Sequence, residues 1–159
     1  MLFITNRFPK GSIQTRVGRK FDFDLRNNAP SNSVFFCRLG EDGTCTEVGG
    51  LNFMSALKQS PYRQLLLYIH GYSNLPEDVF KGALEFQQLC DRKCAEEVLV
   101  VPVIWPCDND LGIIKDYWDD QKAADASAPS FARALCRFIE WRESNLNDPD
   151  SDQIGRAHV

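Results

Sequence analysis

The chain has 159 residues, of which 43% are hydrophobic and 25% are charged, and its formal net charge is −4. This length suffices for one domain with a buried core, and the composition excludes a disordered or collagen-like chain. Because the charge is negative and no lysine or arginine run occurs, a surface for nucleic acid or an anionic membrane is disfavoured, and we expect small or neutral partners.

The beginning of the chain, MLFITNRFPK, has four apolar residues before Thr5 and basic residues soon after it. It therefore lacks the apolar region of a secretory signal. No later segment approaches the roughly 18 apolar residues that span a bilayer. These features predict a cytoplasmic protein with no membrane span. The six cysteines have no framework spacing, so we expect reduced thiols.

The first fifty residues have the pattern of a β-meander. Residues 2–5 form a short strand candidate, and the alternation of apolar and polar residues at 21–25 predicts a strand with one buried face. A turn cluster at 27–33 precedes another predicted strand at 34–39. The sequence EDGT at 41–44 is typical of a turn.

The most apolar stretch runs from Leu65 to Ile69 and predicts a central strand buried on both faces. A weak helical pattern at 51–58 precedes it. The strand ends in His70-Gly71, where the glycine permits backbone geometry that other residues resist. A helix follows within a few residues. This is the layout in which an α/β sheet presents backbone N–H groups to a ligand beyond the carboxyl ends of its strands.

The helix after this strand has a recognisable start and one apolar face. Asn74 is a candidate N-cap, Pro76 suits the first turn, and Glu77 comes three residues after the cap. Gly82 costs the helix about 1 kcal/mol relative to alanine and is a candidate for a close approach to the sheet. The apolar face is formed by Val79, Ala83, Phe86, Cys90 and Cys94.

A second strongly apolar strand is predicted at 97–105, with Pro102 suggesting a bulge or a less fully paired second half. Strand, helix and strand joined in this way predict a right-handed crossover with parallel strands. Residues 106–126 are acidic and are expected to be irregular. Ser127-Ala128-Pro129 predicts the start of a second helix over about 129–143.

The pair His70-Gly71 is the sharpest candidate for chemistry. Taken alone, it fits equally a functional turn or a histidine that merely ends a strand. The surrounding strand and helix favour the functional interpretation. A tight turn at this place can direct a backbone N–H, here that of Tyr72, at an oxyanion that develops during acyl transfer.

Several further segments are distinctive when taken together: LLLYIHGYSN, VLVVPVIWP, Tyr117-Trp118-Asp119-Asp120 and the run ADASAP at 124–129, with FITNR at the start of the chain. Together they resemble a bacterial family of α/β-hydrolases of unknown function that is usually described as esterase/lipase-like. The resemblance extends to about residue 144. It implies a partial α/β-hydrolase fold, in which an amino-terminal β-meander leads into a mostly parallel sheet with flanking helices and the later strands are lacking.

The resemblance also implies site residues. The Tyr72 N–H would be an oxyanion donor, with His70 and Gly71 shaping the turn. Tyr117 and Asp120 would line a pocket, although a solvated loop explains them equally well. Cys107 stands where the family usually has a serine that is not the nucleophile, so we expect this change to be tolerated. The candidate substrate-binding residues are Tyr72, Ser73, Trp105 and Tyr117.

The family's nucleophile lies in a Gly-x-Ser-x-Gly elbow, and its triad follows the order serine, acid, histidine. This sequence contains no such elbow, and His158 lies in a tail without a fold pattern. The resemblance therefore implies that the full-length form is a serine hydrolase of a small ester-type molecule, without metal or cofactor. We expect this chain alone to be inactive.

Residues 1–152 are predicted to be the amino-terminal part of a single α/β-hydrolase domain, followed by an unstructured tail at 153–159. The tail, QIGRAHV, is what a widely used sequencing adapter encodes in one reading frame before a stop codon. We therefore expect that adapter read-through cut the open reading frame.

Other interpretations fit less well or stay open. Cys90 and Cys94 share a helix face, but without a second ligand pair they are better interpreted as thiols than as metal ligands. Residues 108–110 with Asp119 weakly resemble a calcium loop, which Ile113 excludes because glycine is needed there. A competing hypothesis is a complete small α/β module, without catalysis, whose His-Gly turn shapes a ligand pocket. The sequence does not predict an oligomeric state.

Overall fold

The computed structural model describes residues 1–107, 113–145 and 156–158. One mixed sheet has the strand order β3-β2-β1-β5-β4-β6. Its strands are β1 (Leu2–Arg7), β2 (Pro30–Leu39), β3 (Cys45–Glu47), β4 (Gln64–Ile69), β5 (Val98–Ile104) and β6 (Arg156–His158). The helices are α1 (Gly50–Lys58), α2 (Pro76–Lys93) and α3 (Ile113–Asn145). The predicted α/β class and partial α/β-hydrolase fold are confirmed.

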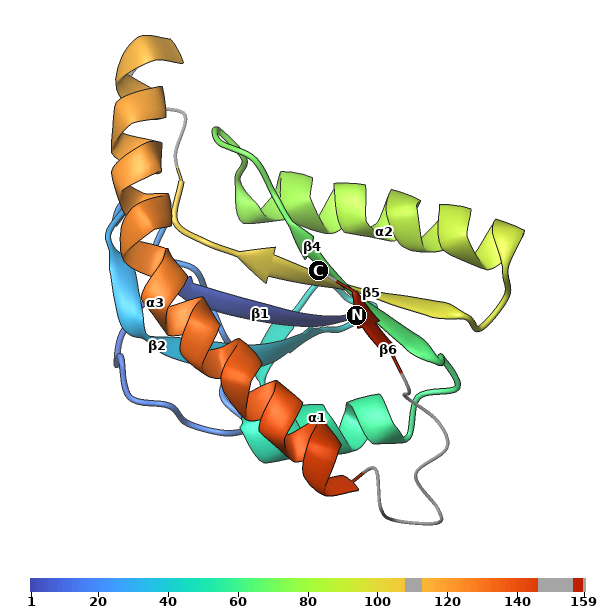
Figure 1. Ribbon diagram of the computed structural model, residues 1–159. Helices are drawn as coiled ribbons and strands as arrows, with labels where there is room; N and C mark the ends of the chain where they lie inside the picture. The colour runs from blue at the N-terminus through green and yellow to red at the C-terminus, as the bar shows by residue number, and fades with distance from the viewer. Residues whose placement is uncertain (108–112, 146–155, 159) are drawn as a thin grey trace.

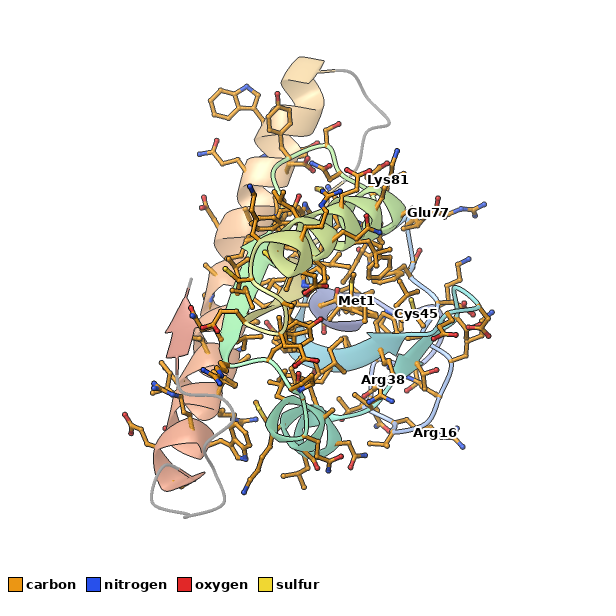
Figure 2. The ribbon with its side chains drawn as sticks, turned by 90° about the vertical axis from the view of Figure 1, so that its right-hand side faces the viewer. Met1, Arg16, Arg38, Cys45, Glu77 and Lys81 are labelled. Atoms are coloured by element: carbon orange, nitrogen blue, oxygen red, sulfur yellow. The ribbon has the colours of Figure 1, made fainter. Side chains whose placement is uncertain are left out.

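The strands β1, β5 and β4 are parallel, whereas β2 and β3 run antiparallel to their neighbours. Figure 1 shows α3 crossing the sheet on the face opposite α2, and Figure 2 shows α2 and α1 on opposite sides of the sheet. Among the hydrophobic clusters of the described residues, two fill the layers on the faces of the sheet. The cluster under α2 includes Phe3, Phe21, Phe35, Val79, Phe80 and Ile104, and the cluster under α1 and α3 includes Phe53, Leu57, Leu65, Val101 and Phe138.

The central strand β4 is less completely buried than its apolar sequence predicts. Leu65 is buried, but Ile69 at the other end is 56% exposed. On one side β4 pairs with β5 along its whole length, while on the other β6 pairs only with Gln64, Leu65 and Leu66. Thus the tail that we expected to be unstructured contributes a three-residue strand.

The predicted strand at 21–25 is wrong. Its backbone makes isolated contacts instead of a ladder, with bridges from Phe23 to Pro9 and from Lys20 to Thr46. Phe21 is nevertheless buried, with its ring 5.3 Å from that of Phe35. The first apolar residue of this segment is therefore buried without strand pairing, whereas Leu25 at its end is 42% exposed. Two further differences are that β2 begins inside the turn predicted at 27–33 and that the sequence analysis missed β3.

The helix α2 begins where predicted but uses another cap. Its N-cap is Leu75, whose backbone N–H donates to the Asp78 carboxylate at 3.3 Å. Asn74, the predicted cap, lies one residue earlier. The close approach at Gly82 is confirmed, because a Cβ added there would lie 3.2 Å from the Tyr68 hydroxyl on β4.

The helix α3 is much longer than the predicted span of 129–143. It begins at Ile113, inside the segment expected to be irregular, and Pro129 lies in its interior. A proline lacks the backbone N–H that an inner turn needs. Ala123, Ser127 and Ser130 are buried around that position, so packing against the sheet outweighs the local preference. In the described residues, no helix is long and apolar enough to cross a membrane.

Pro102 also behaves differently from its prediction. The register between β4 and β5 continues without a shift through the pair Tyr68 and Pro102. The half of β5 that lacks a second neighbour among the described strands is the first, because β1 pairs only with Val103 and Ile104. The proline is therefore accommodated without a bulge in this ladder.

We predict that Phe35→Ala lowers the free energy of unfolding by about 3–5 kcal/mol, because it opens a cavity among buried aromatic rings. Urea denaturation monitored by circular dichroism measures the change. Leu51→Ala is the control, since Leu51 is 88% exposed and should change stability by no more than about 0.5 kcal/mol. Equal effects of the two substitutions would contradict the assigned core.

Candidate functional site

The site lies at the carboxyl ends of the parallel strands. Because β1, β5 and β4 run in the same direction, the residues that follow them meet at one edge of the sheet. These residues are the end of β1 at Arg7, the turn from His70 to Asn74, and the segment Trp105–Cys107 after β5. The amino-terminal half of α3 lies beside the same edge (Figure 1).

His70 is held by Trp105 through three contacts. The two rings stack with centroids 5.0 Å apart and planes within 2° of parallel. The backbone N–H of Trp105 donates to His70 Nε2 at 3.2 Å, and the indole N–H donates to the His70 carbonyl at 2.9 Å. The remaining ring nitrogen, Nδ1, lies 2.7 Å from the Gly71 carbonyl oxygen. These partners assign the neutral tautomer with a proton on Nδ1.

The charge state of His70 follows from its surroundings. Burial lowers its pKa below the ordinary value, and the nearby Arg7 guanidinium acts in the same direction. Nε2 accepts a hydrogen bond and Nδ1 donates one, so both ring nitrogens are engaged. The histidine thus has a structural role at the turn, and the functional interpretation of the pair stays a prediction.

Asn74 closes the turn from the other side. Its side-chain amide donates to the Tyr72 carbonyl at 2.8 Å and to the Gly71 carbonyl at 3.2 Å. The sequence analysis assigned Asn74 to the helix cap and missed this role. The available signal was local, because asparagine in a turn commonly bonds backbone groups within a few residues.

The thiol of Cys107 holds the backbone of Asn74. The thiol donates to the Asn74 carbonyl at 2.9 Å and accepts the Asn74 N–H at 3.2 Å. Its side chain is completely buried. A serine hydroxyl is also both donor and acceptor, so the serine that the resemblance implies at this position could form the same two contacts.

Asp120 joins α3 to the turn. Its carboxylate is fully buried and accepts the Ser73 N–H at 2.8 Å and the Asn28 side-chain amide at 3.2 Å. Ser73 has a φ of 57°, which lies in the left-handed region. The solvated-loop interpretation of Asp120 is therefore wrong, because this residue lies on a helix and faces the turn.

The buried Arg7 links β1 to the end of β5. Its guanidinium donates to the Cys107 carbonyl at 2.6 Å. Next to it, the Thr5 hydroxyl donates to the Ile104 carbonyl at 2.7 Å. Both contacts cross about 100 residues of sequence, so they were not predictable from local patterns.

The remaining residues predicted to bind substrate differ in their exposure. Tyr72 is 52% exposed, whereas Trp105 is buried against His70. Tyr117 belongs to α3, and its side chain lies outside the described residues, as do residues 108–110 of the rejected calcium loop. Within the described residues, no group of three or more histidine, cysteine or acidic side chains is arranged to hold a metal ion.

An apolar cavity of about 130 Å³ lies between the sheet and α3. Ile69, the residue before His70, forms part of its wall, so the cavity reaches the vicinity of the turn. The lining is formed almost entirely by carbon atoms, including Leu65, Leu67, Phe131, Leu135 and Phe138. Such a space can accommodate an apolar group.

Comparison with known proteins identifies one family. The model of an alpha/beta hydrolase of unknown function (DUF900) matches residues 50–145. No curated protein and no solved structure matches the chain. The matched residues include the turn, the Trp105–Cys107 segment and Asp120.

We predict that His70 titrates with a midpoint below about 6.5, the ordinary value for histidine, because burial disfavours its charged form. Below about pH 6.5 the unfolded chain binds a proton at this histidine more readily than the folded chain does. The free energy of unfolding therefore decreases as the pH is lowered. NMR titration of the imidazole measures the midpoint and the tautomer. His70→Gln assigns the resonance and should weaken this pH dependence. A midpoint above 6.5 would contradict the assignment.

We predict that Cys107→Ser changes the free energy of unfolding by no more than about 1 kcal/mol, because a hydroxyl can replace both thiol contacts with Asn74. Cys107→Ala removes both and should cost about 1–3 kcal/mol. Chemical denaturation of the two variants provides the comparison. Equal stability of the serine and alanine variants would show that these hydrogen bonds do not support the turn.

Proposed function

The chain belongs to the DUF900 family of α/β-hydrolases of unknown function, and we propose that it forms part of a serine hydrolase that cleaves a small ester-type substrate. In this proposal the turn from His70 to Asn74 contributes one side of the oxyanion hole. Tyr72 provides the donor through its backbone N–H, while His70 and Gly71 give the turn its shape. The observation that carries the proposal is the orientation of the peptide between Gly71 and Tyr72.

The carbonyl end of this peptide is held inward. The Gly71 oxygen receives the His70 Nδ1 proton at 2.7 Å and the Asn74 amide at 3.2 Å. No peptide bond in the described residues is cis, so the Tyr72 N–H points in the direction opposite to the Gly71 carbonyl. The N–H is thus directed away from His70. A donor fixed before the substrate arrives is what stabilises a developing oxyanion.

The hydrogen bonds to the Gly71 carbonyl also support the assignment to Tyr72. Hydrogen bonds to a carbonyl polarise its peptide and strengthen the N–H at the other end as a donor. Loss of one oxyanion donor typically lowers the rate by about 10²- to 10³-fold, so this one group would be a substantial part of the catalysis.

The surroundings suggest what the substrate resembles. The apolar cavity beside Ile69 would suit an apolar acyl group, and the exposed Tyr72 would contact the substrate next to it. Ser73 and Tyr117 would lie at the edge of the same site. Trp105 would act indirectly, since its ring and N–H groups hold His70. The proposed partner is therefore a small molecule, and neither nucleic acid nor a cofactor is required.

The nucleophile and the base would come from outside this sequence. It contains no Gly-x-Ser-x-Gly elbow, and both ring nitrogens of His70 are engaged within the turn. Without a nucleophile and a base, a hydrolase retains only binding and oxyanion effects. We accordingly propose that this chain by itself is inactive and that a longer product of the same locus is active.

We predict that the 159-residue chain neither reacts with a fluorophosphonate serine probe nor hydrolyses p-nitrophenyl esters above background. The coding region amplified from source DNA should yield a longer protein that does both. Replacement of the elbow serine by alanine in that longer protein is the control and should abolish the labelling. Stoichiometric labelling of the 159-residue chain would refute the proposed division of the site.

A second candidate function is a complete non-catalytic α/β module. The observation that favours it is the pairing of β6 with β4, which covers Gln64 to Leu66 at the edge of the sheet. The same experiment separates the two candidates. If the source locus encodes a stop after Val159 and the protein melts cooperatively as a monomer, the module is the better account.

A further inference from the structure

We propose that Asp120 is a positioning residue for the turn, acting from α3 on the peptides around Tyr72 and Ser73. Its importance for catalysis rests on the proposed function, but its effect on the turn can be measured without any hydrolysis. The evidence is a set of contacts that joins three distant parts of the chain.

The first step concerns the backbone of Ser73. This residue has a φ of 57°, a conformation that a serine rarely adopts without support. Its N–H donates to Asp120 Oδ2 at 2.8 Å, a hydrogen bond strengthened by the acceptor's charge. Asp120 is completely buried, so water does not compete for this contact. The carboxylate therefore supports the conformation that turns the chain back toward α2.

The second step concerns the orientation of neighbouring peptides. In the peptide between Tyr72 and Ser73, the carbonyl is held by the Asn74 side chain and the N–H by Asp120. Both ends of that plane are thus fixed. The preceding peptide is held at its carbonyl by His70 and Asn74. Asp120 thereby fixes the Ser73 N–H, whereas His70 and Asn74 orient the preceding peptide through the Gly71 carbonyl.

The third step concerns Asn28, which precedes β2. Its side-chain nitrogen donates to Asp120 Oδ1 at 3.2 Å, while its side-chain oxygen has no hydrogen-bond partner among the described residues. An asparagine introduced at position 120 could still accept the Ser73 N–H. Its new NH₂ group would then face Asn28, which can rotate its amide by 180° and accept with that oxygen. Asp120→Asn should therefore preserve the contacts with Ser73 and Asn28 but remove the charge.

The test compares Asp120→Ala and Asp120→Asn with Asp119→Asn as the matched control. Asp119 is the neighbouring acid on α3, and its partly exposed side chain lies 3.5 Å from Lys122. Amide hydrogen exchange and ¹H–¹⁵N spectra report on Ser73 and Tyr72 individually. Asp120→Ala should lower the protection of the Ser73 amide by at least about tenfold, as expected for loss of a hydrogen bond to a charged group. It should also shift the Tyr72 resonance.

Asp120→Asn should keep the protection of Ser73 within about threefold, because the asparagine oxygen rescues the contact, but the weaker bond should move the Ser73 amide proton upfield. Asp119→Asn should change neither signal. Ser73→Gly, which adopts the same φ without strain, should recover stability lost in Asp120→Ala. If Asp120→Ala does not fold, the chemical shift of the Ser73 amide proton in Asp120→Asn is the deciding measurement: an upfield shift supports the proposal, and an unchanged shift contradicts it.

The proposal is overturned if both Asp120 variants leave the Ser73 and Tyr72 signals as Asp119→Asn does, even when they lower the melting temperature. That result would describe a residue that only attaches α3 to the sheet. These readouts do not involve ester cleavage. A failure of the hydrolase proposal would consequently leave the positioning result intact, and the reverse also holds.

Discussion

The parallel pairing of β4 with β5 is the constraint on which the site depends. The pairing runs without a shift from Gln64 opposite Val98 to Ile69 opposite Val103. Because β4 ends opposite Val103, one residue before the end of β5, His70 and Trp105 emerge near each other and exchange two hydrogen bonds while their rings stack. A slip of one residue would turn every side chain of β4 to the opposite face and separate this pair.

Beyond this pair, the turn is held by hydrogen bonds from buried polar groups. Burying such groups is costly unless each finds partners, and a network with satisfied members can define one conformation. Cys107 engages both backbone groups of Asn74, and Asp120 accepts from both Ser73 and Asn28. These contacts come from the end of β5, from α3 and from the segment before β2. The turn therefore acquires its shape from the assembled fold and not from its own sequence.

This origin explains how much the sequence could predict. Long apolar runs and helical spacing identified β4, α2 and β5 and their parallel crossover, because burial and period are local properties of a sequence. The turn at His70 and Gly71 was also visible locally. The length of α3 was not, because tertiary packing overcame Pro129 and an acidic composition.

The roles of Asn74 and Asp120 were missed for two different reasons. Asn74 lies one residue before the N-cap of α2, so a helix cap and a turn residue compete for the same short pattern. Asp120 reaches the turn across 47 residues of sequence, and its helix was not predicted at that point. Only the register of α3 against the sheet decides which acid, Asp119 or Asp120, faces inward.

The hydrogen bonds of His70 also constrain how such a turn can take part in catalysis. A general base needs an available lone pair, whereas here Nε2 accepts from the Trp105 backbone and Nδ1 donates to Gly71. Releasing Nδ1 for proton transfer would remove a hydrogen bond from the Gly71 carbonyl, and releasing Nε2 would remove the contact with the Trp105 backbone. In the proposed hydrolase, His70 would therefore orient the Tyr72 peptide, and another residue would act as the base.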